Sequence, residues 1–120
     1  MGHFRRKEPA IQLGNLDVSR DFSDVRAVAT VYRRLLEVRP LGETVNICSG
    51  EATSLRSILE LAKQISGHSI EIKVNPAFVR SNDVKELRGD PAKLKSIIGP
   101  WDTPELPETL RWMIESDWPH

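Results

Sequence analysis

Two arginines in stretches without a helical or strand period are the residues best suited to do chemistry. Arg20 stands directly before Asp21 in "VSRDF", and Arg80 stands three residues before Asp83 in "VRSNDV". A guanidinium offers a planar fork of donors that suits phosphate oxygens, and it stays charged at any relevant pH. Two arginines from separate loops could therefore clamp a diphosphate, while the Asp83 carboxylate could accept hydrogen bonds from ribose hydroxyls. Asn15, in "GNL", is a third polar loop residue.

The same residues also allow a second interpretation, in which they form ordinary surface ion pairs. Arg20 could pair with Asp21 or Asp24, and Arg80 with Asp83. Ion pairs between exposed side chains contribute only about 0–1 kcal/mol to stability. From the spacing alone, both interpretations stay open.

Composition and charge exclude several classes of partner. The chain has 120 residues, which fits one domain, and it carries 17 Lys and Arg against 17 Asp and Glu. The formal net charge of zero argues against nucleic acid and against an anionic membrane surface as general partners. No apolar run approaches the roughly 20 residues that span a bilayer, and the basic N-terminus lacks the apolar core of a secretory signal. Any anion bound here must be held locally by a few placed residues.

Cysteine and histidine usage argues against a disulfide and against zinc. Cys48 is the single cysteine, so no internal disulfide can form, and we expect a reducing, cytoplasmic location. Cys48 lies in a strand pattern with no nearby cation, which favours a buried structural thiol over a nucleophile. The three histidines, His3, His68 and His120, lie far apart, so a zinc site is not expected.

Hydrophobic periodicity predicts strands alternating with helices. Strands are expected at 10–16, 43–50 and 68–74, and helices at 25–38, 52–67, 90–99 and about 106–118. The 25–38 helix is expected to bury one apolar face, made of Val25, Val28, Ala29, Tyr32, Leu35 and Leu36. Residues 75–89 are expected to form a long loop. The fold class is therefore α/β, a small single domain over 1–120 with short strands and about four helices, and residues 1–9 are expected to be a flexible N-terminal arm.

The motifs of cofactor and nucleophile chemistry are absent from the sequence. No G-x-G-x-x-G or G-x-x-G-x-x-G turn links a strand to a helix, and no phosphate-binding G-x-x-x-x-G-K-[ST] loop or G-x-S-x-G elbow occurs. The only tyrosine, Tyr32, is followed four residues later by Leu36, so no Tyr-x-x-x-Lys pair exists. The chain alone is therefore expected to bind no cofactor.

Four stretches, in order, resemble one enzyme family. They are "LGNLDVSRDFSDVRAV", "GETVNICSGEATSLRSILELAKQISG", "IEIKVNPAFVRSNDVKELRGDPAKLKSIIG" and "LPETLRWMIE". Together they are similar to the C-terminal half of extended short-chain dehydrogenase/reductases, the NAD-dependent epimerase/dehydratase family, which act on nucleotide-diphosphate sugars. Within that family the sequence most resembles GDP-6-deoxy-mannose reductases and GDP-mannose 4,6-dehydratases. The resemblance covers about 10–115 and implies the C-terminal part of a Rossmann-fold enzyme.

The resemblance implies substrate-binding roles for the two arginine stretches. Arg20 stands where the arginine of the family's R-D-[FWY] motif contacts the substrate pyrophosphate, and Phe22 occupies the aromatic position near the nucleotide. Arg80 and Asp83 match the family's R-x-x-[DE], which supplies a second phosphate arginine and a carboxylate for the ribose.

Two further stretches match the family less closely. Asn15 and Leu16 stand where the family chain passes beside the nucleotide base. "NICSG" matches the family's YN-x-x-[ST]-G strand, although Val45 replaces the usual tyrosine. That strand is interpreted as structural.

The resemblance also implies what the chain lacks. Family members carry the NAD(P) turn, a Ser/Thr and the Tyr-x-x-x-Lys on an N-terminal Rossmann half, which is absent from these 120 residues. The chain is therefore expected to bind GDP-mannose or GDP-4-keto-6-deoxymannose but to be catalytically incomplete. An apolar face left bare would be covered by a Rossmann-domain partner or by a second copy. The alternative is a non-catalytic interaction or oligomerisation module with ordinary surface arginines.

Overall fold

Two small sheets organise the molecule. The computed structural model describes residues 1–79 and 83–116. Strand β1 (Ala10–Leu13) pairs in parallel with β4 (Glu71–Val74), in a register that sets Ala10 opposite Glu71. The second sheet has the order β3-β2-β5, with β2 (Ser19–Asp21) at its centre. β2 runs antiparallel to β3 (Ala52–Ser54) and parallel to β5 (Glu86–Leu87).

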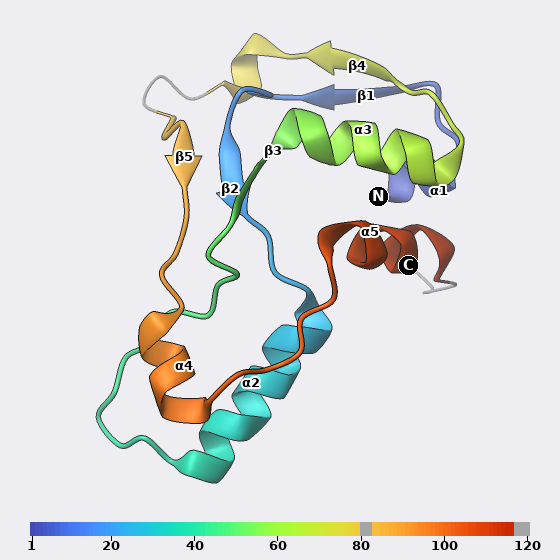
Figure 1. Cartoon of the computed structure of the whole chain (residues 1–120). Helices are drawn as coiled ribbons and strands as arrows, with labels where there is room; N and C mark the ends of the chain where they lie inside the picture. The colour runs from blue at the N-terminus through green and yellow to red at the C-terminus, as the bar shows by residue number, and fades with distance from the viewer. Residues whose placement is uncertain (80–82, 117–120) are drawn as a thin grey trace.

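A hydrophobic core lies beneath the β1–β4 sheet. Helix α3 (Leu55–Ser66) packs under this sheet, and α5 (Leu106–Glu115) lies on the other side of α3 (Figure 1). The buried members of the core are Phe4, Leu16, Leu59, Ala62, Ile70 and Ile114, and the sheet adds the partly buried Ile11, Leu13 and Ile72. Ser54 caps α3 by accepting a hydrogen bond from the Ser57 amide, and Gly67 ends it in the left-handed conformation.

Helices α2 (Val25–Val38) and α4 (Ala92–Ile98) form a second group that extends away from this core (Figure 1). Val31 of α2 and Leu94 of α4 are fully buried where the two helices pack together. Arg34 on α2 also donates to the carbonyl oxygens of Ile98 and Pro100, which holds the end of α4 against α2. None of the helices in the described ranges is long and apolar enough to cross a membrane.

The expected N-terminal arm is instead an ordered element. Residues Gly2–Arg5 form helix α1, and Phe4 is buried between α3 and α5. Arg5 donates a 2.8 Å hydrogen bond to the Ser116 carbonyl at the end of α5. The expectation of a flexible arm over 1–9 was therefore wrong, because one buried aromatic side chain ties this segment to the core.

The strand expected over 43–50 is also not found. This stretch takes part in no strand pairing among the described residues, and the strand forms later, at Ala52–Ser54. The expected loop over 75–89 contains a short 3-10 helix, η1 (Pro76–Phe78), and strand β5. The strand expected at 68–74 forms only as β4 at Glu71–Val74; Ile70, just before it, is buried, Ile72 packs against the core and Val74 is exposed. These differences reflect pairing partners that are distant in sequence, which local patterns do not encode.

The expected buried face of α2 differs from the observed one. The structure buries Ala27 and Val31, whereas Val25, Tyr32 and Leu36 are exposed. The predicted helix bounds are confirmed, and Asp24 caps the first turn through the Arg26 amide. The apolar period therefore predicted the helix correctly, but the chain covers the face that the period marks only in part, at the half-buried Val28 and Leu35.

Candidate functional site

An ion pair between Arg20 and Asp83 forms the centre of the candidate site. Nη2 of Arg20 donates to Oδ1 of Asp83 at 2.8 Å, and Nη1 donates to the carbonyl oxygens of Val84 at 2.7 Å and Ser19 at 2.9 Å. Both charged side chains are half-buried. These contacts engage three of the five N–H donors of the guanidinium, so donors remain that an anion could accept from.

The pairing of β2 with β5 brings these two residues together. Ser19 lies opposite Glu86 and Arg20 opposite Leu87 in the parallel ladder, and the Ser19 amide donates to the Lys85 carbonyl at 2.7 Å. This ladder fixes the chain just before β5, where Asp83 and Val84 lie, against the side chain of Arg20. In the surface-pair interpretation, Arg20 was expected to form an ion pair with Asp21 or Asp24. That choice of partners was wrong, because the observed partner is Asp83.

Asn15 joins the same cluster. Its Nδ2 lies 3.4 Å from Oδ2 of Asp83, while its Oδ1 accepts from the Asp17 amide at 2.9 Å. Immediately before it, Gly14 passes so close to η1 that a Cβ there would lie 2.5 Å from the Phe78 carbonyl oxygen. The end of β1 therefore needs glycine at this position to bring Asn15 beside Asp83.

The other predicted site residues are placed differently. Leu16 is buried in the core with Phe4 and Leu59, and its predicted place beside the nucleotide base stays a prediction. Phe22 is partly exposed and lines a neighbouring pocket. Arg80 lies outside the described residues, so its predicted role stays a prediction.

Asp21 points to the opposite side of β2 from Arg20 and fastens two other segments to the strand. Its Oδ1 accepts from the amide and hydroxyl of Ser49 at 2.8 and 2.6 Å, and its Oδ2 accepts from the amides of Gly50 at 2.9 Å and Gly89 at 3.3 Å. Burial by itself would raise the pKa of Asp21. These hydrogen bonds outweigh burial and hold the pKa below its ordinary value, with the Ser49 hydroxyl first among them.

Asp24 links the start of α2 to α5 through hydrogen bonds. Its side chain is fully buried and accepts from Nη2 of Arg26 at 2.7 Å and from the Thr109 hydroxyl at 2.6 Å. The Arg26 hydrogen bonds, together with that of Thr109, hold the pKa of Asp24 far below its usual range despite burial. The Arg26 guanidinium in turn lies 4.4 Å from the centre of the Trp112 ring. From the sequence, Asp24 was expected as a possible ion-pair partner of Arg20.

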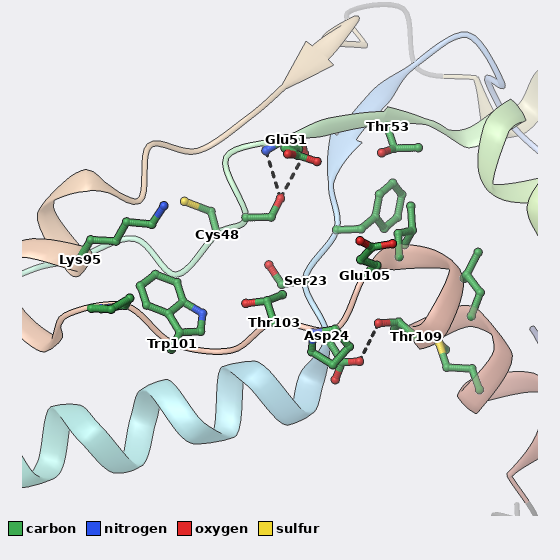
Figure 2. Close-up of a pocket in the computed structure, with 17 residues that line it drawn as sticks. Ser23, Asp24, Cys48, Glu51, Thr53, Lys95, Trp101, Thr103, Glu105 and Thr109 are labelled. Carbon is green, nitrogen blue, oxygen red and sulfur yellow. Dashed lines mark hydrogen bonds between the residues drawn. The ribbon is translucent and has the colours of Figure 1, made fainter.

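A pocket of about 580 Å³ opens beside the charged cluster. Figure 2 shows the Asp24–Thr109 hydrogen bond near one end, with Trp101 and Lys95 toward the other. Phe22 and Thr53 also line this pocket, and Thr53 is the β3 residue that pairs with Arg20. The charged cluster and the pocket therefore adjoin at the β2–β3 ladder. Sequence reasoning missed the pocket, because it is assembled from segments far apart in the chain.

Cys48 behaves as a structural thiol. Burial raises the pKa of its thiol, and the nearby carboxylates of Asp21 and Asp90 raise it further. No group of three His, Cys, Asp or Glu side chains within residues 1–79 and 83–116 could hold a metal ion.

The sequence of this chain matches one known protein family over nearly its whole length. A family model described as GDP-mannose 4,6 dehydratase matches residues 3–113. The chain belongs to this family. It is therefore a member of the NAD-dependent epimerase/dehydratase group of short-chain dehydrogenases, as its resemblance implied.

Two relatives of this chain have names that specify GDP-sugar substrates. The GDP-6-deoxy-D-talose 4-dehydrogenase of Aggregatibacter actinomycetemcomitans is 42% identical over 96 residues, which cover 80% of this chain and 33% of that protein. The GDP-6-deoxy-D-mannose reductase of Pseudomonas aeruginosa is 35% identical over 108 residues, which cover 90% of this chain and 35% of that protein. The family member thus spans about a third of the length of the curated relatives it matches.

Solved structures show the same relation in three dimensions. A structure from Burkholderia cenocepacia matches with 49% identity and a TM-score of 0.90 over 94% of this chain and 37% of that chain. The structure of RMD from Pseudomonas aeruginosa complexed with NADPH matches with 29% identity and a TM-score of 0.81 over 94% and 40%. The predicted α/β fold, equivalent to a part of these enzymes, is confirmed.

The described residues lack the motif to which a dinucleotide cofactor binds in Rossmann folds. No glycine-rich turn leads from a strand into a helix within 1–79 and 83–116.

Proposed function

We propose that this chain is the nucleotide-sugar-binding portion of an NAD(P)-dependent GDP-sugar dehydratase or reductase. The observation that supports it is the 2.8 Å contact between Arg20 and Asp83, in which a phosphate-type donor and a ribose-type acceptor lie side by side. A cation held by a strand ladder is pre-organised, so little side-chain entropy is lost when an anion binds. The site therefore suits a ribonucleoside diphosphate better than an isolated phosphate.

In the proposed complex, each residue of the cluster has one task. Arg20 directs its remaining N–H donors at the diphosphate. Asp83 accepts from the ribose hydroxyls, and Asn15 lies beside it on the side toward the base. Arg80, from the stretch between η1 and Asp83, supplies a second guanidinium. Phe22 lies two residues after Arg20 and faces the adjoining pocket, near the nucleotide.

The identity of the ligand rests on the family. The relatives are named for GDP-6-deoxy-talose and GDP-6-deoxy-mannose, so we propose GDP-mannose or GDP-4-keto-6-deoxymannose as the ligand. The chain spans only about a third of these relatives, so we propose that a separate cofactor-binding part supplies the chemistry. We accordingly expect no NADPH oxidation when the isolated chain is mixed with GDP-4-keto-6-deoxymannose, and measurable turnover would contradict this.

Calorimetric titration of the chain with GDP, GDP-mannose, UDP and NADPH tests the proposal. We expect saturable binding of GDP and GDP-mannose, weaker binding of UDP and none of NADPH. Arg80→Ala should weaken GDP binding. Arg56→Ala is the matched control, because Arg56 pairs with Asp17 on an exposed surface. Absence of binding by any nucleotide would sink the proposal and favour a non-catalytic interaction module.

A further inference from the structure

The 3-10 helix η1 holds the side chain of Phe78 beside the charged cluster of Arg20, Asp83 and Asn15. Gly14, the residue directly before Asn15, passes so close to η1 that a Cβ on it would lie 3.2 Å from Cβ of Phe78. The Phe78 side chain therefore begins beside the end of β1. The residue is 57% exposed, so much of its apolar surface is open to a ligand.

Hydrogen bonds fix η1, and Phe78 with it, to the end of β1. The Asn75 amide donates to the Leu13 carbonyl at 2.8 Å, and Nδ2 of Asn75 donates to Oε1 of Gln12 at 3.3 Å. Oδ1 of Asn75 caps η1 by accepting from the Ala77 amide at 3.0 Å, and the Phe78 amide donates to the Asn75 carbonyl at 3.0 Å. A ring carried on a fixed backbone loses little freedom when a ligand packs against it.

The two carboxylate oxygens of Asp83 give the cluster a direction. Oδ1 accepts from Nη2 of Arg20 at 2.8 Å, whereas Nδ2 of Asn15 lies 3.4 Å from Oδ2. In a nucleoside diphosphate the ribose lies between the diphosphate and the base. With the diphosphate at Arg20 and the ribose at Asp83, the base is therefore directed toward Asn15. Next to Asn15 in the chain is Gly14, which adjoins Phe78.

We infer that the Phe78 ring is the platform on which the base of the nucleotide stacks. The inference rests on the proposed function, in which Arg20 and Asp83 bind the diphosphate and the ribose. Every base has a flat π-face, and stacking of that face on an aromatic side chain strengthens binding without hydrogen bonds to the base edges. A purine presents a larger face than a pyrimidine, so this platform favours GDP over UDP.

Calorimetry with the intact chain and two probes, GDP and inorganic pyrophosphate, tests the inference. Phe78→Ala should weaken GDP binding by about five- to a hundredfold, the usual effect of removing a stacking ring. Binding of pyrophosphate, which has no base, should be unchanged. Phe78→Tyr keeps the ring and should bind GDP as the wild type does. Tyr32→Ala is the matched control, because it removes an aromatic ring from a residue of similar exposure, 60%, on α2.

Proton NMR of bound GDP separates stacking from an indirect effect on the charged cluster. A ring beneath the base shifts the guanine H8 resonance upfield, so the wild type and Tyr32→Ala should produce this shift and Phe78→Ala should not. Phe78→Ala should also keep the wild-type melting temperature, because Phe78 is mostly exposed.

The outcomes distinguish this inference from the proposed function. Equal GDP binding by the wild type and Phe78→Ala would overturn the inference and leave the proposed function standing. So would an equal loss of GDP and pyrophosphate binding in a folded Phe78→Ala chain, because Phe78 would then only position the cluster. Failure of the wild type to bind GDP would refute the proposed function, and the inference with it.

Discussion

The Arg20 guanidinium and the Asp83 carboxylate meet at 2.8 Å although 63 residues separate them in the chain. The contact exists because β2 pairs with β5, and it leaves both groups partly open to solvent. The neighbouring acids have other tasks. Asp21 binds the backbone of residues 49, 50 and 89, and Asp24 closes the start of α2. Arg20 is thus the cation of this strand, and it faces the partly exposed carboxylate of Asp83.

Replacing Asp83 should separate ribose recognition from phosphate recognition. Asp83→Asn keeps the shape but removes the charge that accepts from ribose hydroxyls. A lost hydrogen bond to a charged group is worth about 1.5–3 kcal/mol, so GDP affinity should fall by roughly ten- to a hundredfold. Affinity for inorganic pyrophosphate should not fall, because Arg20 keeps its donors. Asp17→Asn, at an exposed ion pair with Arg56, is the control. Equal losses for both ligands would show that Asp83 acts only through Arg20.

Replacing Asp24 should destabilise the fold and leave the charged cluster of Arg20, Asp83 and Asn15 unchanged. Asp24→Ala removes the helix cap and leaves Arg26 and Thr109 without their acceptor. We expect a loss of about 2–4 kcal/mol in the free energy of unfolding by urea. Asp17→Ala should change it by less than about 1 kcal/mol. A small loss for Asp24→Ala would mean that α5 packs on α2 without this link.

The same carboxylates should make the fold sensitive to acid. The pKa values of Asp21 and Asp24 are lower in the folded chain than in the unfolded one, where an aspartate titrates near about 3.9. Their stabilisation is therefore complete well above about pH 4 and is lost as the pH falls through the folded-state values. Urea unfolding between pH 7 and pH 3 should show this decline. The decline should be shallower in Asp24→Asn, and an identical pH profile in that variant would contradict the assignment.

Gly89 should tolerate no side chain. A Cβ at this position would lie 2.5 Å from Sγ and 2.6 Å from Cβ of Cys48, beside the Asp21 carboxylate. Gly89→Ala should therefore lower the free energy of unfolding by about 1–3 kcal/mol. The Gly89→Ala, Cys48→Gly double variant should recover part of that loss, measured by thermal melting. If the double variant does not recover stability, the loss in Gly89→Ala does not come from the contact with Cys48.

How much could be predicted from the sequence depends on how local each signal is. Helix α3 was predicted well because its cap at Ser54, its apolar period and its end at Gly67 all lie within one short stretch. The strand pattern at 43–50 failed because a strand needs a partner, and none of the described residues supplies one. Phe4 was missed because one aromatic residue near a terminus carries no periodic signal.

The candidate site was predictable only in part. Spacing left Arg20 open between an ion pair and an anion clamp, and it gave Arg20 the wrong acidic partners. The family resemblance assigned Arg20 and the stretch that holds Asp83 to the same ligand, and that assignment stays a prediction; the structure shows only that Arg20 contacts Asp83. The pocket beside Phe22 was not predictable, because Trp101, Thr53 and Thr109 reach it from three separate segments.

The central claim is that Arg20 holds the diphosphate of a nucleotide. Phosphorus-31 NMR of GDP, recorded while the chain is added, tests it most directly. We expect both phosphorus resonances to shift or broaden saturably with the wild-type chain and with Arg56→Ala, and we expect Arg20→Ala to abolish the effect. Unchanged resonances with the wild-type chain, or an equal effect with Arg20→Ala, would contradict it.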